Sequence, residues 1–263
     1  MKPVENELKA KLAGNRRCFG TWIHSGSPIV AELLGAIGLD FVLIDQEHGP
    51  GDLQDLVAMM QAVAISGTTP MVRVASSDPI HLKRVVDAGA QALLVPMVET
   101  ADEARSIVDA CLYPPYGKRG NANTVVRASR YGLVENYLEN AHQQMLIIPQ
   151  VETVAGVDNA AEMAAVPGVD AVFIGPSDLS GSIGLPGQTN APEVVALIDK
   201  AFAAIAKAGK PVATVPRKDR SWQQLFEDGF NLVVAGSDIA HVREAAVAQR
   251  NEWAKWQSTQ KAR

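Results

Sequence analysis

Short, continuously apolar runs alternate with amphipathic stretches along the whole chain. Each run ends in a cluster of Gly, Pro, Asp or Ser, as expected where a strand enters a loop. Because the runs are apolar throughout, they favour parallel strands that helices cover on their outer face. Eight strands are predicted: Cys18–Ile23, Phe41–Asp45, Pro70–Ala75, Ala92–Pro96, Met145–Glu152, Asp170–Gly175, Pro211–Val215 and Asn231–Gly236.

Helical patterns fill the intervals between several of these runs. The clearest span Asp52–Ile65, Asp78–Gly89, Thr100–Leu112 and Ala191–Gly209. Asp78 followed by Pro79 is typical of a helix start, and Gly89 and Gly209 are typical of helix ends. Eight strand–helix units in 263 residues match an α/β TIM (β/α)8 barrel, which takes about 250 residues.

A doubly wound open sheet is the alternative fold. It usually has fewer strands, and no GxGxxG motif follows the first predicted strand to mark a dinucleotide site. No internal repeat or low-complexity linker is visible, so one (β/α)8 domain over residues 1–263 is predicted. The long loop Tyr113–Arg130 is typical of a lid or an interface. The amphipathic stretch Ile239–Trp256 is either the last barrel helix or a subunit-packing helix.

Composition and charge narrow the possible partners. Hydrophobic residues make up 47% of the chain, and the net charge of −5 comes without a basic stripe, so nucleic acid is not expected as a partner. The apolar runs are much shorter than the roughly 18 residues of a membrane helix, and no secretory signal is evident, which predicts a cytoplasmic protein. Cys18 and Cys111 have neither a metal nor a redox spacing.

Polar residues gather where the predicted strands end, the edge that carries the active site in TIM barrels. Gln150 and Glu152 share a parity on the fifth strand and Asp178 follows the sixth, so two carboxylates converge beside one amide. This oxygen-only set favours a hard divalent ion such as Mg²⁺ or Mn²⁺. About four of six octahedral positions would remain for substrate and water, which invites a chelating substrate. Taken singly, each carboxylate could instead cap a helix.

Two further groups suit an acidic substrate. Arg73 lies inside an apolar strand and needs a carboxylate partner, from the protein or from a ligand. His48, on the loop after the second strand, is a natural general base, and His24 at the end of the first strand competes for that role. A keto acid would engage the arginine, the metal and the base together. Since no lysine lies at a suitable strand end for a Schiff base, the predicted chemistry is aldol addition or cleavage through a metal-stabilised enolate.

Five segments are specific in combination: AELLGAIGLDFVLIDQEHGP, PMVRVASSDPIHLKRVVDAGAQALLVPMVETADEA, YPPYGKRG, QVET and DAVFIGPSDLS. In this order they resemble the metal-dependent class II pyruvate aldolases of the 4-hydroxy-2-oxoheptanedioate and 2-keto-3-deoxy-sugar-acid aldolase type. The resemblance implies a barrel of the phosphoenolpyruvate/pyruvate-binding type. It also implies an enzyme that joins pyruvate or hydroxypyruvate to an aldehyde and uses Mg²⁺, Mn²⁺ or Co²⁺.

By position, the resemblance assigns a role to each matching residue. It makes His48 the base, organised by Asp45, and Arg73 the residue that binds pyruvate and stabilises its enolate. Asp87 matches an acid that raises the basicity of that histidine from a neighbouring subunit. The metal ligands are Glu152 and Asp178. The substrate contacts are Arg73, Gln150, Gly175, Pro176, Ser177 (a position that is often Ala), Asp178 and Val215.

The resemblance further implies a homohexamer, a dimer of trimers that exchanges C-terminal helices between subunits. Arg119 and its loop would lie near a subunit contact or on the acceptor side. Two other functions share parts of this site. One is a citryl- or malyl-thioester lyase, which needs a coenzyme A site, and the other is a keto-acid-binding barrel without turnover. The combination of Arg73, His48 and both carboxylates argues against the latter, since binding alone needs no base.

Overall fold

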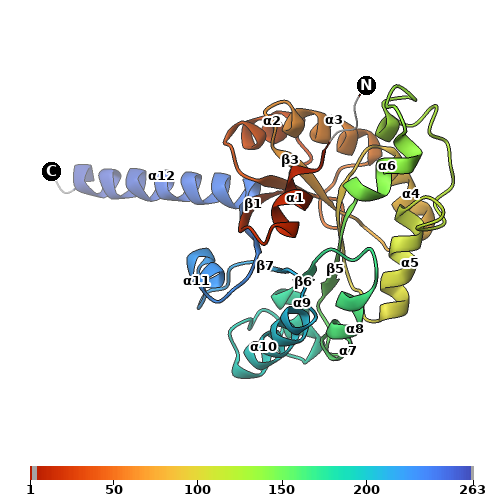
Figure 1. Cartoon of the computed structure of the whole chain (residues 1–263). Coiled ribbons are helices and arrows are strands. Elements are labelled where there is room, and N and C mark those ends of the chain that lie inside the picture. The colour runs from red at the N-terminus through yellow and green to blue at the C-terminus, as the bar shows by residue number, and fades with distance from the viewer. Residues whose placement is uncertain (2–4, 262–263) are drawn as a thin grey trace.

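Eight parallel strands close into a barrel in the computed structural model, which describes residues 1 and 5–261 (Figure 1). Each strand pairs with the next in chain order, and the last pairs with the first. The strands are β1 (Cys18–Ile23), β2 (Phe41–Asp45), β3 (Thr69–Arg73), β4 (Ala92–Val95), β5 (Leu146–Val151), β6 (Val172–Ile174), β7 (Val212–Thr214) and β8 (Leu232–Ser237). The predicted TIM barrel is confirmed and the open sheet is wrong, because an open sheet leaves its edge strands unpaired.

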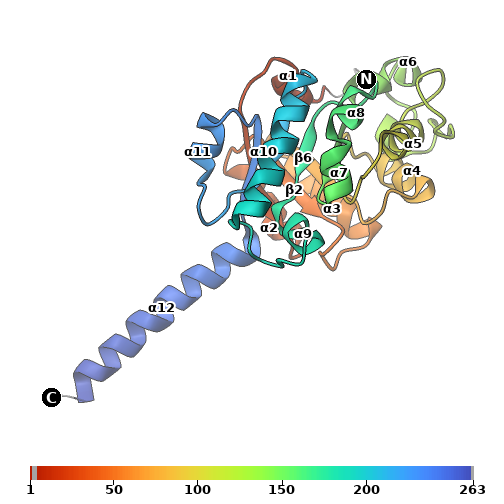
Figure 2. The same ribbon diagram turned by 90° about the horizontal axis from the view of Figure 1, so that it is seen from below.

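Helices surround the barrel and connect successive strands (Figures 1 and 2). The described residues contain α1 (Glu7–Ala13), α2 (Pro28–Ala36), α3 (Leu53–Ala64), α4 (Pro79–Asp87), α5 (Ala101–Cys111), the 3₁₀ turn η1 (Arg127–Ser129), α6 (Tyr137–Gln144), α7 (Val154–Asp158), α8 (Ala160–Ala165), α9 (Pro176–Ser182), α10 (Pro192–Lys207), α11 (Trp222–Glu227) and α12 (Asp238–Lys261). The four predicted helices, now α3, α4, α5 and α10, are confirmed. Three of them begin directly after the N-cap residues Asp52, Asp78 and Thr100, whose side chains accept backbone N–H bonds of the first turn.

The core has two apolar layers, one inside the barrel and one between the strands and the helices. Inside, Phe41, Leu43 and Phe173 pack with Leu8 and Leu12 of α1. Helix α1 covers the amino ends of the strands, since Lys9 donates to the backbone of Met145 just before β5. With one end closed by apolar packing, the opposite, carboxyl end is left for polar chemistry.

Two segments depart from the regular repeat. Residues 112–136 join α5 to α6 and contain only η1 as regular structure, and the predicted long loop 113–130 forms most of this segment. Helix α12 projects away from the barrel and is exposed over most of its length, with Trp253 and Trp256 near its end (Figure 2). Because it does not pack along its own barrel, the interpretation of Ile239–Trp256 as the last barrel helix is wrong. No helix within the described residues is long and apolar enough to cross a membrane.

Truncation of Leu8 tests how α1 closes the barrel. We expect Leu8→Ala to lower the free energy of unfolding by about 2 to 5 kcal/mol, because the fully buried side chain leaves a cavity. Urea unfolding followed by circular dichroism measures this loss. The matched control is Leu33→Ala on α2, whose residue is 63% exposed and should cost less than about 1 kcal/mol. Equal losses of unfolding free energy in the two variants would contradict the role of Leu8 of α1 in closing the amino end of the barrel.

Candidate active site

The carboxyl end of β5 brings an amide and a carboxylate into direct contact. Gln150 Nε2 donates to Glu152 Oε2 at 2.7 Å, and the backbone N–H of Met97 donates to Glu152 Oε1 at 2.8 Å. Both side chains are buried. The shared face predicted for Gln150 and Glu152 is therefore confirmed.

Glu152 is an acid in surroundings that disfavour its charge. Burial raises the pKa of Glu152 to about 7, and the negative charges of Asp178 and Glu47 add to that rise. The Met97 N–H bond and the charge of Arg73 act in the opposite direction without cancelling it. An added cation would relieve this electrostatic cost, so the position suits a metal ion.

Gly175 and the start of α9 form the adjacent wall of the site. A Cβ atom at position 175 would lie 2.7 Å from Glu152 Oε2 and 2.8 Å from Gln150 Nε2, so only glycine allows this approach. Pro176 and Ser177 follow, and Asp178 lies in the first turn of α9, where its charge acts on both Glu152 and Glu47. Val215, directly after β7, packs partly buried against the interior cluster.

Arg73 forms a two-bond ion pair with Asp45 across β3 and β2. Its Nε donates to Asp45 Oδ1 at 2.9 Å and its Nη2 to Oδ2 at 2.7 Å, while Nη1 lies 3.1 Å from Glu47 Oε2. The guanidinium also lies over the Trp22 ring, 4.5 Å from its centroid. The carboxylate partner that Arg73 requires thus comes from the protein. Five N–H groups leave at least two free to meet a ligand.

Burial raises the pKa of Asp45, but hydrogen bonds from His24 and Arg73 outweigh it and hold that pKa well below its usual range. Asp45 is therefore a fixed negative charge at neutral pH. It also accepts the backbone N–H groups of Glu47 at 3.0 Å and His48 at 3.4 Å. One carboxylate consequently shapes the loop that carries the predicted base.

Two imidazoles lie at this edge of the barrel, and their surroundings differ. His24 Nε2 lies 3.2 Å from Asp45 Oδ2, and its ring stacks on Trp22 with centroids 5.4 Å apart. The side chain of His48 is 64% exposed, and its Nε2 lies 3.8 Å from Glu47 Oε2. Thus His24 is held in the buried network, whereas His48 is open to a substrate. The role of His48 as the base stays a prediction.

Asp87 lies apart from these groups within its own chain. It ends α4, and Arg119 donates to its Oδ1 from Nε at 3.1 Å and from Nη2 at 2.5 Å. Arg119 is buried and stacks over Tyr113, 4.3 Å from the ring centroid. An action of Asp87 on the histidine of a neighbouring subunit stays a prediction.

Glu47 and the Met97 amide have contacts that sequence reasoning did not assign. Glu47 lies two residues beyond Asp45, so the alternation of side chains along a strand indicates that both face the barrel mouth. That alternation was the signal available in the sequence. Met97 contributes through its backbone at a φ of 55°, a left-handed conformation that its side-chain type gives no reason to expect.

The residues fit a metal site of two protein carboxylates. Among the described residues no group of three or more His, Cys, Asp and Glu is placed to hold an ion. A cation bound here would therefore need amide, substrate and water oxygens besides the two carboxylates. Gln150 Oε1 is buried without a hydrogen-bond partner in the described part of the chain, which leaves one such oxygen available. Glu152, Asp178 and this amide are the hard donors that Mg²⁺ or Mn²⁺ prefers.

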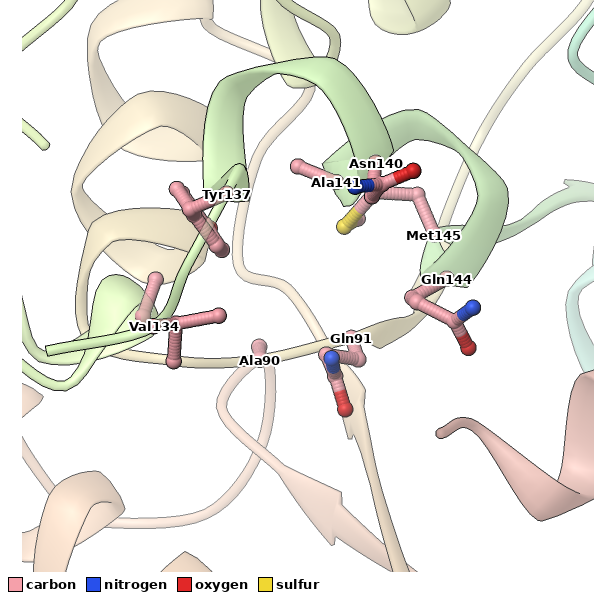
Figure 3. Close-up of a pocket in the computed structure, with 9 residues that line it drawn as sticks. Ala90, Gln91, Val134, Tyr137, Asn140, Ala141, Gln144 and Met145 are labelled. Atoms are coloured by element: carbon pink, nitrogen blue, oxygen red, sulfur yellow. The ribbon is translucent and has the colours of Figure 1, made fainter. Parts of the chain in front are cut away.

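A separate pocket between α6 and the starts of β4 and β5 is too small for a substrate (Figure 3). Val134, Tyr137, Asn140, Gln144 and other residues line a cavity of about 20 Å³, which holds about one water molecule. It lies at the amino ends of the strands, away from the carboxylates. The candidate site is therefore the polar mouth at the carboxyl ends.

The carboxyl edge of this closed (β/α)8 barrel brings together buried acids, a paired arginine and two imidazoles, which is a set of groups suited to acid–base and metal-assisted catalysis. Residues 18–245 match the HpcH/HpaI aldolase/citrate lyase family, and the chain belongs to that family.

The chain is similar to individual members of this family over nearly its full length. The chain is 42% identical to a hydroxypyruvate/pyruvate aldolase from Sagittula stellata, with 95% of this chain and 98% of the relative covered. It is 40% identical to a 4-hydroxy-2-oxo-heptane-1,7-dioate aldolase from Escherichia coli, with 93% and 94% covered. A solved family protein from Burkholderia cenocepacia superposes with a TM-score of 0.90 at 35% identity, covering 95% and 99%. Solved citrate lyase structures are more distant and show only the same fold.

Replacement of Glu152 tests whether its charge destabilises the metal-free protein. Its pKa rises from 4.5 to about 7 on folding, so folded protein holds a proton that unfolded protein releases. Stability is therefore lost as pH rises through this window. Without metal, Glu152→Gln should remove this loss. Relative to the wild type, the variant should therefore be more stable at about pH 8 than at about pH 5, by roughly 2 to 3 kcal/mol in the free energy of unfolding.

Chemical unfolding of EDTA-treated protein at the two pH values measures this gain. The control is Glu162→Gln, at an exposed glutamate of α8, which should change stability equally at both. A pH-independent effect of Glu152→Gln would contradict the assignment of an electrostatic cost to Glu152.

Proposed function

We propose that this protein is a metal-dependent pyruvate aldolase that adds pyruvate or hydroxypyruvate to an aldehyde and cleaves the resulting 4-hydroxy-2-oxo acids. The observation that carries the proposal is the buried Gln150–Glu152 pair with Asp178 beside it, at the same barrel mouth as the Arg73–Asp45 pair. The names of the relatives from Sagittula stellata and Escherichia coli support it.

The cofactor in this proposal is a divalent cation, Mg²⁺, Mn²⁺ or Co²⁺, held by Glu152 and Asp178. When bound, it would act as a Lewis acid that draws electron density from the keto oxygen and lowers the pKa of the neighbouring methyl group. Gln150 and the backbone from Gly175 to Ser177 would orient the keto acid. The requirement for glycine at position 175 is consistent with a substrate held close to this backbone.

The chain's own groups then handle charge and protons. Arg73, fixed by Asp45, would donate its remaining N–H groups to the developing negative charge on the donor. In the addition direction His48 would remove a proton from the pyruvate methyl carbon, which then bonds to the aldehyde carbon as that carbonyl oxygen gains a proton. In cleavage the same imidazole would take the proton of the 4-hydroxyl group as the C3–C4 bond breaks, and would return it to the enolate carbon to give pyruvate.

A citryl- or malyl-thioester lyase is the second candidate function. The family description includes citrate lyase, and both reactions need a stabilised enolate. Cleavage of a thioester with no turnover of free hydroxy-keto acids would favour this candidate. Keto-acid binding without methyl proton loss would favour the non-catalytic barrel.

Exchange of the pyruvate methyl protons in heavy water tests the first half of the proposed reaction. EDTA-treated enzyme should show little exchange by NMR, and Mn²⁺ or Mg²⁺ should restore it. Glu152→Ala should lower the restored rate by about 100-fold or more, because one of two protein ligands is lost. Exchange that is equal with and without metal would contradict the metal-dependent mechanism.

Paired histidine variants identify the base. His48→Asn should lower both exchange and aldol cleavage by about 10²- to 10⁴-fold, the usual contribution of a positioned general base. His24→Asn should lower them less and should instead reduce stability, since His24 bonds to buried Asp45. Kinetics and thermal unfolding of both variants provide the measurement. Loss of exchange in His24→Asn with retention in His48→Asn would transfer the role to His24.

We further propose a homohexamer that buries α12 of each subunit against a second copy. An isolated 24-residue helix with exposed Ile239, Val242, Trp253 and Trp256 gains stability only from packing on a partner. The stacked rings of Trp253 and Trp256, 5.0 Å apart and more than half exposed, offer an apolar surface near the free end.

Sedimentation over a range of protein concentrations tests this assembly. Wild-type protein should sediment as a hexamer, and the double variant Trp253→Ala/Trp256→Ala should dissociate at concentrations where the wild type does not. Lys255→Ala, at the residue directly before Trp256, is the control and should keep the wild-type mass. A monomeric wild-type protein would refute the proposed assembly.

A further inference from the structure

Arg217 is a buried arginine whose guanidinium is not satisfied by the described residues. It follows β7 by three residues, and its side chain is only 5% exposed. Its Nε and Nη1 atoms are buried and have no hydrogen-bond partner in the described part of the chain. Burial of a charged group without bonded partners is costly, so an arginine in this state indicates a missing partner.

The chain direction places the loop of Arg217 at the mouth of the barrel. Ala213 of β7 and Val215 directly after it pack with the interior cluster, and Arg217 follows two residues further on, beyond the carboxyl end of the strand. Its backbone forms two hydrogen bonds with Arg220, at 2.9 and 3.1 Å, which close the loop into a tight turn. Strand β7 pairs with β6, whose carboxyl end leads to Gly175 and Asp178. The loop therefore lies at the same edge as the candidate metal ligands.

Within the residues that the structure describes, Arg217 lacks the close carboxylate partner that the other buried arginines have. Asp219 Oδ1 lies 3.4 Å from Arg217 Nε without hydrogen-bond geometry, and Asp219 is partly exposed. By contrast, Arg73 and Arg119 each direct two N–H groups to a carboxylate at 2.5 to 3.1 Å. The guanidinium of Arg217 thus keeps N–H groups free to bind an anion, whereas Arg73 uses most of its N–H groups on protein carboxylates.

We propose that Arg217 binds the terminal oxyanion of the acceptor aldehyde, either a carboxylate or a phosphate, and so selects acceptors that carry a negative charge. This rests on the proposed aldolase function and adds an acceptor contact to it. Because the eight strands follow chain order around the barrel, β7 lies opposite β3, which carries Arg73. One arginine serves the donor keto acid, and the other meets the far end of the acceptor. Guanidinium groups match carboxylate and phosphate alike.

Two matched pairs of acceptors measure this selection. The pairs are 4-oxobutanoate with butanal, and glyceraldehyde 3-phosphate with glyceraldehyde, each with pyruvate as donor and saturating Mn²⁺. In Arg217→Gln the KM for the charged member of the preferred pair should rise roughly 10- to 100-fold, the loss typical of a charge-assisted hydrogen bond. The ratio of the KM for the charged acceptor to the KM for the neutral acceptor should rise by the same factor. The pair with the larger change identifies carboxylate or phosphate as the recognised group.

Variants of the same loop provide the controls. Arg220→Gln removes an exposed arginine that pairs with Asp228 and should leave the KM ratio as in the wild type. Arg217→Lys should give a ratio between those of the wild type and Arg217→Gln. Asp219→Asn removes the competing charge and should lower the KM for charged acceptors by a few fold, which tests the site with Arg217 intact if Arg217→Gln fails to fold.

The outcomes separate this inference from the proposed function. Suppose that the wild type exchanges the pyruvate methyl protons but Arg217→Gln leaves the ratio of KM values for charged and neutral acceptors unchanged. That result would overturn the inference and leave the proposed function intact. Equal increases of KM for charged and neutral acceptors would show that Arg217 only supports the loop. A higher or unchanged KM in Asp219→Asn would also count against it. Absence of exchange and of aldol turnover in the wild type would overturn the proposed function itself.

Discussion

The ion pair between Arg73 and Asp45 organises the catalytic edge of this barrel. It joins β2 to β3 at their carboxyl ends and is buried, so its strength is little reduced by solvent. The pair holds the side chain of Glu47 through Arg73. Through Asp45 it holds His24 and the backbone N–H groups of Glu47 and His48. Loss of either partner would leave an unpaired buried charge, which costs more than the pair contributes.

The same edge contains more negative charge than the fold can compensate. Burial raises the pKa of both Glu47 and Glu152, and Arg73 offsets this only in part. Glu47, Glu152 and Asp178 are thus kept near one another at a cost to the stability of the metal-free protein. Such a cost is expected where residues are selected for a ligand and not for stability, since a bound cation repays it in the functional state.

Much of the barrel could be predicted because hydrophobic periodicity and helix capping are local signals. β1 and β2 match their predicted limits, Cys18–Ile23 and Phe41–Asp45, to the residue. Predictions for β6 and β7 were longer than the strands, because the apolar pattern extends beyond the residues that pair with neighbouring strands. The orientation of Ile239–Trp256 could not be predicted either, since an amphipathic helix packs equally well on its own barrel or on a partner.

Parity along strands likewise predicted that Gln150 and Glu152 meet, because a two-residue repeat fixes the face of each side chain. It could not predict which of His24 and His48 bonds to Asp45, since that depends on loop conformation after the strands. It also could not separate Arg73 from Arg217, which both follow barrel-facing positions. Their difference lies in whether a carboxylate from an adjacent strand reaches the guanidinium. Asp45 does so for Arg73, whereas only loop residue Asp219 approaches Arg217, so the second arginine keeps its charge available at the mouth.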